Sequence, residues 1–327
     1  MDLALGFLFS IVGLAVLAVA ADQFVKGAAR LAVLLHVSPV VVGAIVVGFG
    51  TSAPEMVLSG LAAFRGDLDL GVGNIIGSNV ANISLVLGSA ALITAIPVSA
   101  LTVKRDGLTS VLAVVVFALV VQNGLNRWEG SLLIGLLVIW LFLVLRGSKS
   151  KTESVVQEDS GKERPDHNIA EFVGEDKSPG WVETLRTVFG LIFVVVSAYL
   201  LVDGADRIAE AFELSGGFVG YTLVAVGTSA PELVTAIAAA RQRETDLMVG
   251  NVLGSNVFNS LAVGGLISIV GPGPIPDIKL HTVGAAIMAL ICILSWCTMA
   301  ANHRVTYRDS IVLLSLWLGS IFLLATG

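Results

Sequence analysis

Apolar and polar stretches alternate along the chain in a pattern typical of a multi-span membrane protein. Ten apolar stretches are long enough to cross a bilayer as helices, which takes roughly 17–25 residues. They cover residues 3–22, 38–64, 69–93, 106–122, 130–146, 184–203, 217–240, 246–270, 280–300 and 308–326. The pattern predicts an all-α integral membrane protein with ten transmembrane helices.

The ten predicted helices form two groups of five that repeat one another. With a constant offset of 177 residues and no gap, Val25–Gly88 aligns with Val202–Gly265, and the best part of the match has 21 identities in 39 positions. Five is an odd number of crossings, so the second group must enter the membrane from the opposite side. The sequence therefore predicts an inverted-topology repeat. The expected domains are a first repeat at 1–146 (motif 48–88), a linker at 147–180 and a second repeat at 181–327 (motif 225–265).

Composition and charge set the environment and the orientation. Charged residues make up 13% of the chain, about half their share in a soluble domain. Residues 147–180 are polar, have almost nothing to bury, and are predicted to be a disordered linker. With the N-terminus outside, 15 of the 19 basic residues fall on the inner side. The positive-inside rule then places both termini outside and the linker in the cytoplasm, in the plasma (inner) membrane.

The ends and the loops add little to this assignment. Met1–Ala21 is apolar but has no positively charged start, so it is interpreted as a retained span and not as a signal peptide. No basic stretch indicates nucleic acid, and no protein partner is implied. The expected surroundings are the lipid bilayer.

The segment GTSAPE occurs twice, at Gly50–Glu55 and Gly227–Glu232, inside apolar stretches. A proline inside a helix leaves a carbonyl unpaired, and a carboxylate in hydrocarbon costs about 2.5–3.5 kcal/mol on insertion scales. The pattern predicts broken helices near mid-membrane whose oxygens bind a hard cation such as Ca²⁺ or Na⁺. The candidate ligands are backbone carbonyls from Gly48 to Thr51, Ser52 and Glu55, and in the second copy Ala225, Thr228, Ser229 and Glu232.

A second motif, GNxxGSNxxN, follows in each half at Gly73–Asn82 and Gly250–Asn259. Ser78 and Asn82 are four residues apart and share one helix face, as do Ser255 and Asn259. Two carboxylates with these neutral oxygens would balance one Ca²⁺ or two Na⁺. Close packing and interhelical hydrogen bonds explain the remaining asparagines of the motif at least as well, namely Asn74, Asn79, Asn251 and Asn256.

These paired motifs resemble the two alpha-repeats of the cation/calcium antiporter superfamily, with prokaryotic sodium/calcium exchangers as the nearest group. The resemblance implies Na⁺-driven Ca²⁺ extrusion by alternating access, with the first and sixth helices as a sliding gate. It implies a transporter and not an enzyme, and no cofactor besides the transported ions.

The resemblance also implies a role for each candidate ligand. Glu55 and Glu232 would be the central Ca²⁺ ligands, and Asn82 and Asn259 would line the middle position. Archaeal members can carry an aspartate where Asn259 stands, which leaves the participation of H⁺ or K⁺ open. The other implied ligands are the carbonyls of Thr51 and Thr228 for Ca²⁺, and Ser52, Ser78, Ser229 and Ser255 with the carbonyls of Gly48 and Ala225 for flanking Na⁺.

Three other functions remain to be weighed against Na⁺/Ca²⁺ exchange. A proton- or K⁺-coupled cation antiporter would use the same scaffold. A passive cation channel belongs to a different class, but channels usually repeat identical filters around an axis. An intramembrane hydrolase is disfavoured because the spans hold no paired catalytic aspartates and no HExxH motif.

Overall fold

The chain folds almost entirely into helices in this computed structural model, which describes residues 2–34, 52–155, 178–242 and 245–325. Segments labelled η are π-helical: their backbone hydrogen bonds connect residues five apart, instead of four apart as in an α-helix. The first half contains α1 (Asp2–Leu34), α4 (Ala53–Phe64), α5 (Leu68–Ala81), η2 (Asn82–Val86), α6 (Leu87–Ile93), β1 (Ile96–Pro97), α7 (Ala100–Thr102), η3 (Val103–Gly107), α8 (Leu108–Val120) and α9 (Arg127–Val155). The second half contains α11 (Gly180–Phe212), α12 (Gly216–Val219), η4 (Gly220–Val224), α13 (Ala225–Thr228), α14 (Ala230–Gln242), α15 (Thr245–Val257), η5 (Phe258–Val263), α16 (Gly264–Val270), η6 (Leu280–Gly284), α17 (Ala285–Asn302), β2 (Arg304–Val305) and α18 (Tyr307–Ala325).

The described helices agree with most of the predicted spans. Eight are long and apolar enough to cross a membrane, and a ninth span results if the bent pair 216–228 and 230–241 is counted as one. Of the predicted span 38–64, only the short apolar helix α4 lies in the described part of the chain, and residues 35–51 lie outside it. The total of ten therefore stays a prediction.

Helix α9 extends beyond the predicted span 130–146 into the segment expected to be a linker. Helix α9 continues to Val155, so residues 147–155 are helical where the sequence predicted disorder. A helix that leaves the apolar layer can continue in water, because each added residue contributes one backbone hydrogen bond to a turn already formed. Residues 156–177 of the expected linker lie outside the described residues.

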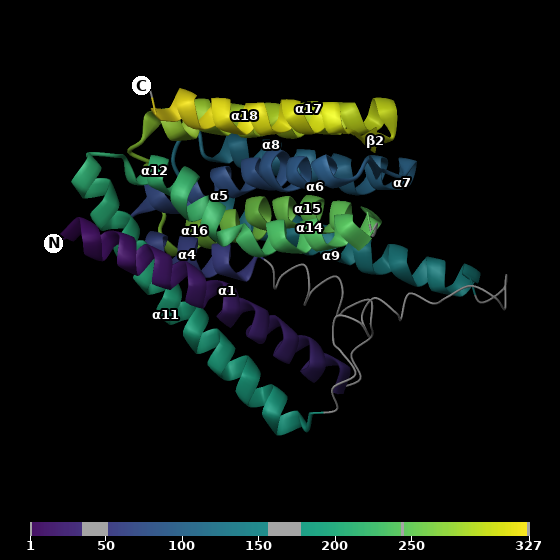
Figure 1. Ribbon diagram of the computed structural model, residues 1–327, viewed down its shortest axis with the longest axis horizontal. Coiled ribbons are helices and arrows are strands. Elements are labelled where there is room, and N and C mark those ends of the chain that lie inside the picture. The colour runs from purple at the N-terminus through teal and green to yellow at the C-terminus, as the bar shows by residue number, and fades with distance from the viewer. Residues whose placement is uncertain (1, 35–51, 156–177, 243–244, 326–327) are drawn as a thin grey trace.

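Helices α1 and α11 lie side by side and run obliquely to the rest of the bundle (Figure 1). Glycines let their backbones approach closely: a Cβ at Gly13 would lie 3.0 Å from the Leu201 nitrogen, and one at Gly204 would lie 2.7 Å from the Ser10 nitrogen. Small residues at helix contacts are the usual way to pack helices tightly in a membrane. The two helices therefore form one closely packed unit.

Two short backbone pairings connect loops of the two halves. β1 pairs antiparallel with β2, with Ile96 opposite Val305. Leu125 and Gly273 exchange two backbone hydrogen bonds of 2.8 and 2.9 Å. The ends of the chain marked N and C lie at the same end of the bundle (Figure 1).

The two spans that carry GNxxGSNxxN form the centre of the bundle. In the most apolar window of each, 83% of the residues are buried, against 11–44% in the other six unbent spans. Each of these spans changes from α- to π-helix within the motif, at η2 and at η5. π-Helical turns are frequent at functional sites because they re-aim side chains.

Candidate ion-binding centre

Each glutamate of the GTSAPE motif lies in the first turn of a helix that begins at a break. Glu55 is in the first turn of α4, next to Pro54 and after the N-cap residue Ser52. Glu232 is in the first turn of α14, after the bend of 42° at Ser229. A helix N-terminus leaves backbone N–H groups unpaired and favours a negative charge. Both glutamates are completely buried, so this local environment helps to hold a carboxylate in the interior.

Each π-helical segment that carries the last asparagine of a GNxxGSNxxN motif packs against a helix of the other half. η2, which begins at Asn82, packs against α14, the helix of Glu232. η5, which contains Asn259, packs against α4, the helix of Glu55. Both asparagines are completely buried. The four side chains thus come from elements that contact one another in a crossed arrangement.

Five hydrogen bonds between described residues join the motifs of the two halves directly, and three of them involve the predicted ligands Ser229, Ser78 and Asn82. The Ser229 hydroxyl donates to Oε1 of Glu55 at 3.4 Å. The hydroxyls of Ser78 and Thr228 are 3.4 Å apart. Nδ2 of Asn82 donates to Oδ1 of Asn256 at 3.1 Å. The structure therefore brings the predicted site residues of both halves together.

Several buried oxygens of this cluster have no hydrogen-bond partner among the described residues. They are Oε2 of Glu55, the hydroxyls of Ser52 and Ser255, and Oδ1 of Asn82 and Asn259. Burying such an atom without a partner costs about 1–3 kcal/mol, which a coordinated cation offsets. Nδ2 of Asn259 also lacks a partner in the described part, and it needs an acceptor such as water.

The donor set fits Ca²⁺ or Na⁺ in its chemistry. It consists of carboxylate, amide and hydroxyl oxygens, which hard cations prefer over nitrogen or sulfur ligands. In the part of the chain that the structure describes, no group of three or more His, Cys, Asp or Glu side chains could hold a metal. The two GTSAPE motifs supply two carboxylates, those of Glu55 and Glu232.

Some predicted ligands lie outside the described residues, and one, the Ala225 carbonyl, already accepts hydrogen bonds. Gly48 and Thr51 lie outside the described residues, so the carbonyl ligands of the first copy stay a prediction. The Ala225 carbonyl accepts from the Ser229 N–H at 3.0 Å and from the Thr228 hydroxyl at 3.3 Å. A carbonyl oxygen has two lone pairs, and here both are already approached by donors.

Two of the asparagines serve packing, as the alternative interpretation expected. Nδ2 of Asn79 donates to Ser260 at 3.2 Å, and Nδ2 of Asn256 donates to the Asn79 carbonyl at 3.3 Å. These bonds join the centres of the two halves. Ser260 could not be predicted from the sequence, and neither could Ser59, which bonds to Asn74 at 2.9 Å, because neither serine belongs to a repeated motif.

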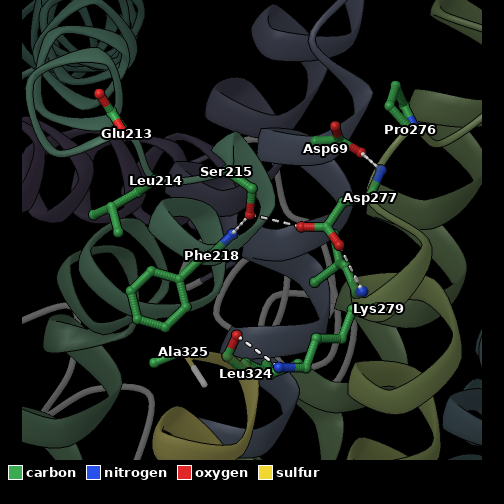
Figure 2. A pocket seen from close by; sticks show the side chains of 11 residues that line it. Asp69, Glu213, Leu214, Ser215, Phe218, Pro276, Asp277, Lys279, Leu324 and Ala325 are labelled. Atoms are coloured by element: carbon green, nitrogen blue, oxygen red, sulfur yellow. Dashed lines mark hydrogen bonds between the residues drawn. The ribbon is translucent and has the colours of Figure 1, made fainter. Parts of the chain in front are cut away.

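A separate cavity of about 470 Å³ lies at the end of α5, α11 and α18 (Figure 2). None of its lining residues is a predicted ion ligand. Its acidic side chains already hold loops together: Asp69 accepts from the Asp277 N–H at 2.9 Å, and Asp277 accepts from the Ser215 hydroxyl at 2.6 Å. We therefore interpret these carboxylates as structural.

Comparison with known proteins gives a consistent family. A family model described as sodium/calcium exchanger protein matches residues 5–146 and 183–326. The putative antiporter CaxA of Alkalimonas amylolytica is 36% identical over 322 residues, which cover 97% of this chain and 98% of the relative. The sodium/calcium exchanger MaX1 of Methanosarcina acetivorans is 28% identical, over 89% of this chain and 91% of the relative. A solved structure of the sodium-calcium exchanger NCX_Mj, soaked with Na⁺ and Sr²⁺, matches with a TM-score of 0.65 and 31% identity over 98% of both chains.

Proposed function

The chain belongs to the sodium/calcium exchanger family, and on that premise we propose that it is a secondary active antiporter that exchanges Na⁺ for Ca²⁺. The Na⁺ gradient drives Ca²⁺ extrusion by alternating access. The observation that carries the proposal is the crossed pair of buried glutamates, Glu55 and Glu232, in a cluster whose oxygens include several without a partner among the described residues.

The charge of this cluster supports competition between the two ions. Two carboxylates balance one Ca²⁺ or two Na⁺, and an uncompensated charge at this depth is costly. If Ca²⁺ and Na⁺ share the glutamates, neither ion binds fully until the other leaves. Such exclusion is what couples the two fluxes in an antiporter.

The proposed ligands are those expected from the sequence. Glu55 and Glu232 bind Ca²⁺, and Asn82 and Asn259 line the same position. The hydroxyls of Ser52, Ser78, Ser229 and Ser255 serve flanking Na⁺ positions. The proposed backbone ligands are the carbonyls of Gly48, Thr51 and Thr228. The carbonyl of Ala225 joins them when the cation replaces its donor at 3.3 Å, the Thr228 hydroxyl.

The proposed architecture is two inverted five-helix repeats, ten helices in all, in the plasma (inner) membrane. Both termini face outside and the linker faces the cytoplasm. The common position of the two chain ends in Figure 1 supports an even number of crossings. Helices α1 and α11 are proposed to slide as one unit over the bundle, which their close mutual packing and oblique direction support.

Cysteine labelling tests the orientation. The exposed positions Asn123 and Arg304 lie on opposite sides in this topology, outside and inside. In a background with Cys292→Ala and Cys297→Ser, a membrane-impermeant maleimide is expected to label Asn123→Cys on intact cells. Arg304→Cys is expected to react only after permeabilisation, and the reverse pattern would overturn the orientation.

Radioactive Ca²⁺ uptake into reconstituted vesicles tests the function. Uptake is expected to follow an imposed outward Na⁺ gradient and to ignore a proton or K⁺ gradient of similar size. Uptake that follows the proton or K⁺ gradient instead would assign the chain to the rival coupling on the same scaffold. Unlabelled Ca²⁺ on one side is also expected to drive uptake of labelled Ca²⁺ from the other side. If this counterflow is absent and Ca²⁺ leaks rapidly through the vesicle membrane, the protein is a passive channel.

A further inference from the structure

Asn74 contacts the proposed Na⁺ ligand Ser78 and, in the other half, Thr228, without being a proposed ligand itself. It lies on α5, is completely buried, and is one helical turn before Ser78. Its Nδ2 donates to the Ser59 hydroxyl at 2.9 Å. Its Oδ1 accepts from the hydroxyls of Thr228 at 3.1 Å and of Ser78 at 3.4 Å.

Ser59 accepts the hydrogen bond from the NH₂ group of this amide. Ser59 is on α4, one turn after Glu55, and is itself completely buried. An amide whose NH₂ group donates to Ser59 must present its oxygen to the opposite side. That oxygen is the acceptor that Ser78 and Thr228 share.

The shared acceptor determines where the hydroxyl lone pairs point. A hydroxyl has one proton and two lone pairs. When Ser78 gives its proton to Asn74, the lone pairs of the Ser78 hydroxyl remain for a cation. If the amide were reversed, its NH₂ group would donate to the Ser78 hydroxyl and occupy one of those lone pairs.

The second half lacks this arrangement. With the offset of 177 residues, Asn251 is the counterpart of Asn74, and Ala236 is the counterpart of Ser59. Alanine has no group that can fix an amide. The hydroxyl of Ser255, the counterpart of Ser78, has no hydrogen-bond partner among the described residues.

We propose that Asn74, held by Ser59, is a positioning residue that orients the Ser78 hydroxyl toward Na⁺. The two flanking Na⁺ positions are therefore unequal: the one at Ser78 is arranged before the ion arrives, and the one at Ser255 is not. This inference rests on the proposed function, because it assumes that Ser78 and Ser255 bind Na⁺. It concerns Na⁺ more than Ca²⁺, whose proposed ligands are the glutamates and backbone carbonyls.

Ser59→Ala in the full-length protein tests this inference with a small change of volume. Binding is measured as the rise of the melting temperature in detergent with added Na⁺ or Ca²⁺, since an ion that binds the folded state stabilises it. The Na⁺ concentration that gives half of the maximal rise in melting temperature is expected to increase about fivefold, because one net hydrogen bond typically changes a binding constant by about this factor. The Ca²⁺ concentration for half the effect is expected to stay unchanged.

Ser260→Ala is the matched control. It removes the same kind of bond, from Nδ2 of a buried asparagine to a serine, but Asn79 orients no proposed ligand hydroxyl. Its Na⁺ and Ca²⁺ curves are expected to overlie those of the wild type. A Ser59→Ala Na⁺ curve that overlies the wild type, or equal shifts for both ions, would overturn the inference.

The same titrations separate this inference from the proposed function. Wild-type protein that binds both ions but shows no Na⁺-dependent Ca²⁺ flux would refute the antiport, while the binding curves would still decide the role of Asn74. Wild-type protein that neither ion stabilises would refute the ion-binding centre and the inference with it.

Discussion

Ser229, in the second half of the chain, donates a hydrogen bond of 3.4 Å to Oε1 of Glu55 in the first half. Ser229 is also the residue at which the helix pair 216–228 and 230–241 bends by 42°. The break in one half thus supports the carboxylate of the other. Any movement that alters the bend changes the surroundings of Glu55, so this residue connects the conformation of the break to a proposed Ca²⁺ ligand.

Removing either central carboxylate should abolish Ca²⁺ transport. Glu55→Gln and Glu232→Gln each keep the size of the side chain but remove one of the two charges proposed to balance a divalent ion, and incomplete neutralisation in the interior is costly. The measurement is Na⁺-driven radioactive Ca²⁺ uptake in reconstituted vesicles. Glu213→Gln, at an exposed glutamate after α11, is the control and should transport normally. Near-normal uptake by either site variant would refute the assignment of that glutamate.

The sequence predicted the centre of the molecule better than its periphery. The constant offset between the two motifs was enough to predict that Glu55 and Glu232 belong to one site. Burying a carboxylate in hydrocarbon is energetically unfavourable, so its occurrence at matched positions of both halves indicates a common function. The crossing of η2 onto α14 and of η5 onto α4 is consistent with that expectation.

Other features depended on three-dimensional contacts that no sequence pattern records. The bond between Ser59 and Asn74 depends on how α4 packs against α5, and Ser59 has no repeated counterpart to draw attention to it. The extension of α9 to Val155 was missed because hydropathy detects the apolar layer and not the end of the helix. Both features depend on packing and backbone geometry, which the sequence pattern does not record.

Gly77 should tolerate no side chain. A Cβ there would lie 2.7 Å from the Tyr221 Cα and from the Ala225 Cβ, so α5 would be pushed away from η4 and α13. Gly77→Ala is expected to lower the free energy of unfolding by about 1–3 kcal/mol through overpacking, and to reduce Ca²⁺ uptake because Ser78 is displaced. Thermal unfolding in detergent and vesicle uptake measure the two effects.

The control for Gly77 is Gly135→Ala on the exposed face of α9, where no heavy atom of the described residues lies within 4 Å of the added Cβ. This variant should unfold at the same temperature as the wild type or higher, since alanine favours a helix by about 1 kcal/mol over glycine. Equal losses in both variants would show that helix glycines matter here for a reason other than packing.

Glu183 should be essential to the stability of the unit formed by α1 and α11. Its buried carboxylate, 1% exposed, accepts from Arg30 at 3.1 Å and from Arg186 at 3.2 Å. Glu183→Ala removes the carboxylate that these two guanidinium groups share, and breaking a buried ion pair in this way costs about 3–5 kcal/mol. A lower melting temperature in detergent is the expected result.

Asp203→Ala on the same helix is the comparison for Glu183. Asp203 pairs with Arg207 at 3.0 Å, but both side chains are about one-third exposed. A pair in such a position contributes about 0–1 kcal/mol, so this variant should be close to the wild type. If Glu183→Ala is no more harmful than Asp203→Ala, the buried cluster does not hold the two helices together.

Asp67, in the turn between α4 and α5, should make stability depend on pH. Its side chain caps α5 by accepting from the Leu70 N–H at 3.0 Å. Burial raises the pKa of Asp67 above its ordinary value of 3.8, although the bond to Leu70 and one to the Asp206 carboxyl oppose the shift. The folded protein therefore holds this proton more tightly than the unfolded chain does. The stability that Asp67 contributes is complete below pH 3.8 and decreases as the pH rises through the raised value.

Asp67→Asn keeps a capping side chain and removes the titration. At about pH 4 the variant should have nearly the same melting temperature as the wild type. As the pH rises toward about 8, the melting temperature of the variant should exceed that of the wild type by a growing margin, because only the wild type must bury a charge at the higher pH. Asp67→Ala also loses the cap and should be less stable than Asp67→Asn by about 1 kcal/mol at every pH. A constant difference between Asp67→Asn and the wild type over the whole range would show that Asp67 does not titrate there. The pH-dependent part of the stability would then have to arise at another group.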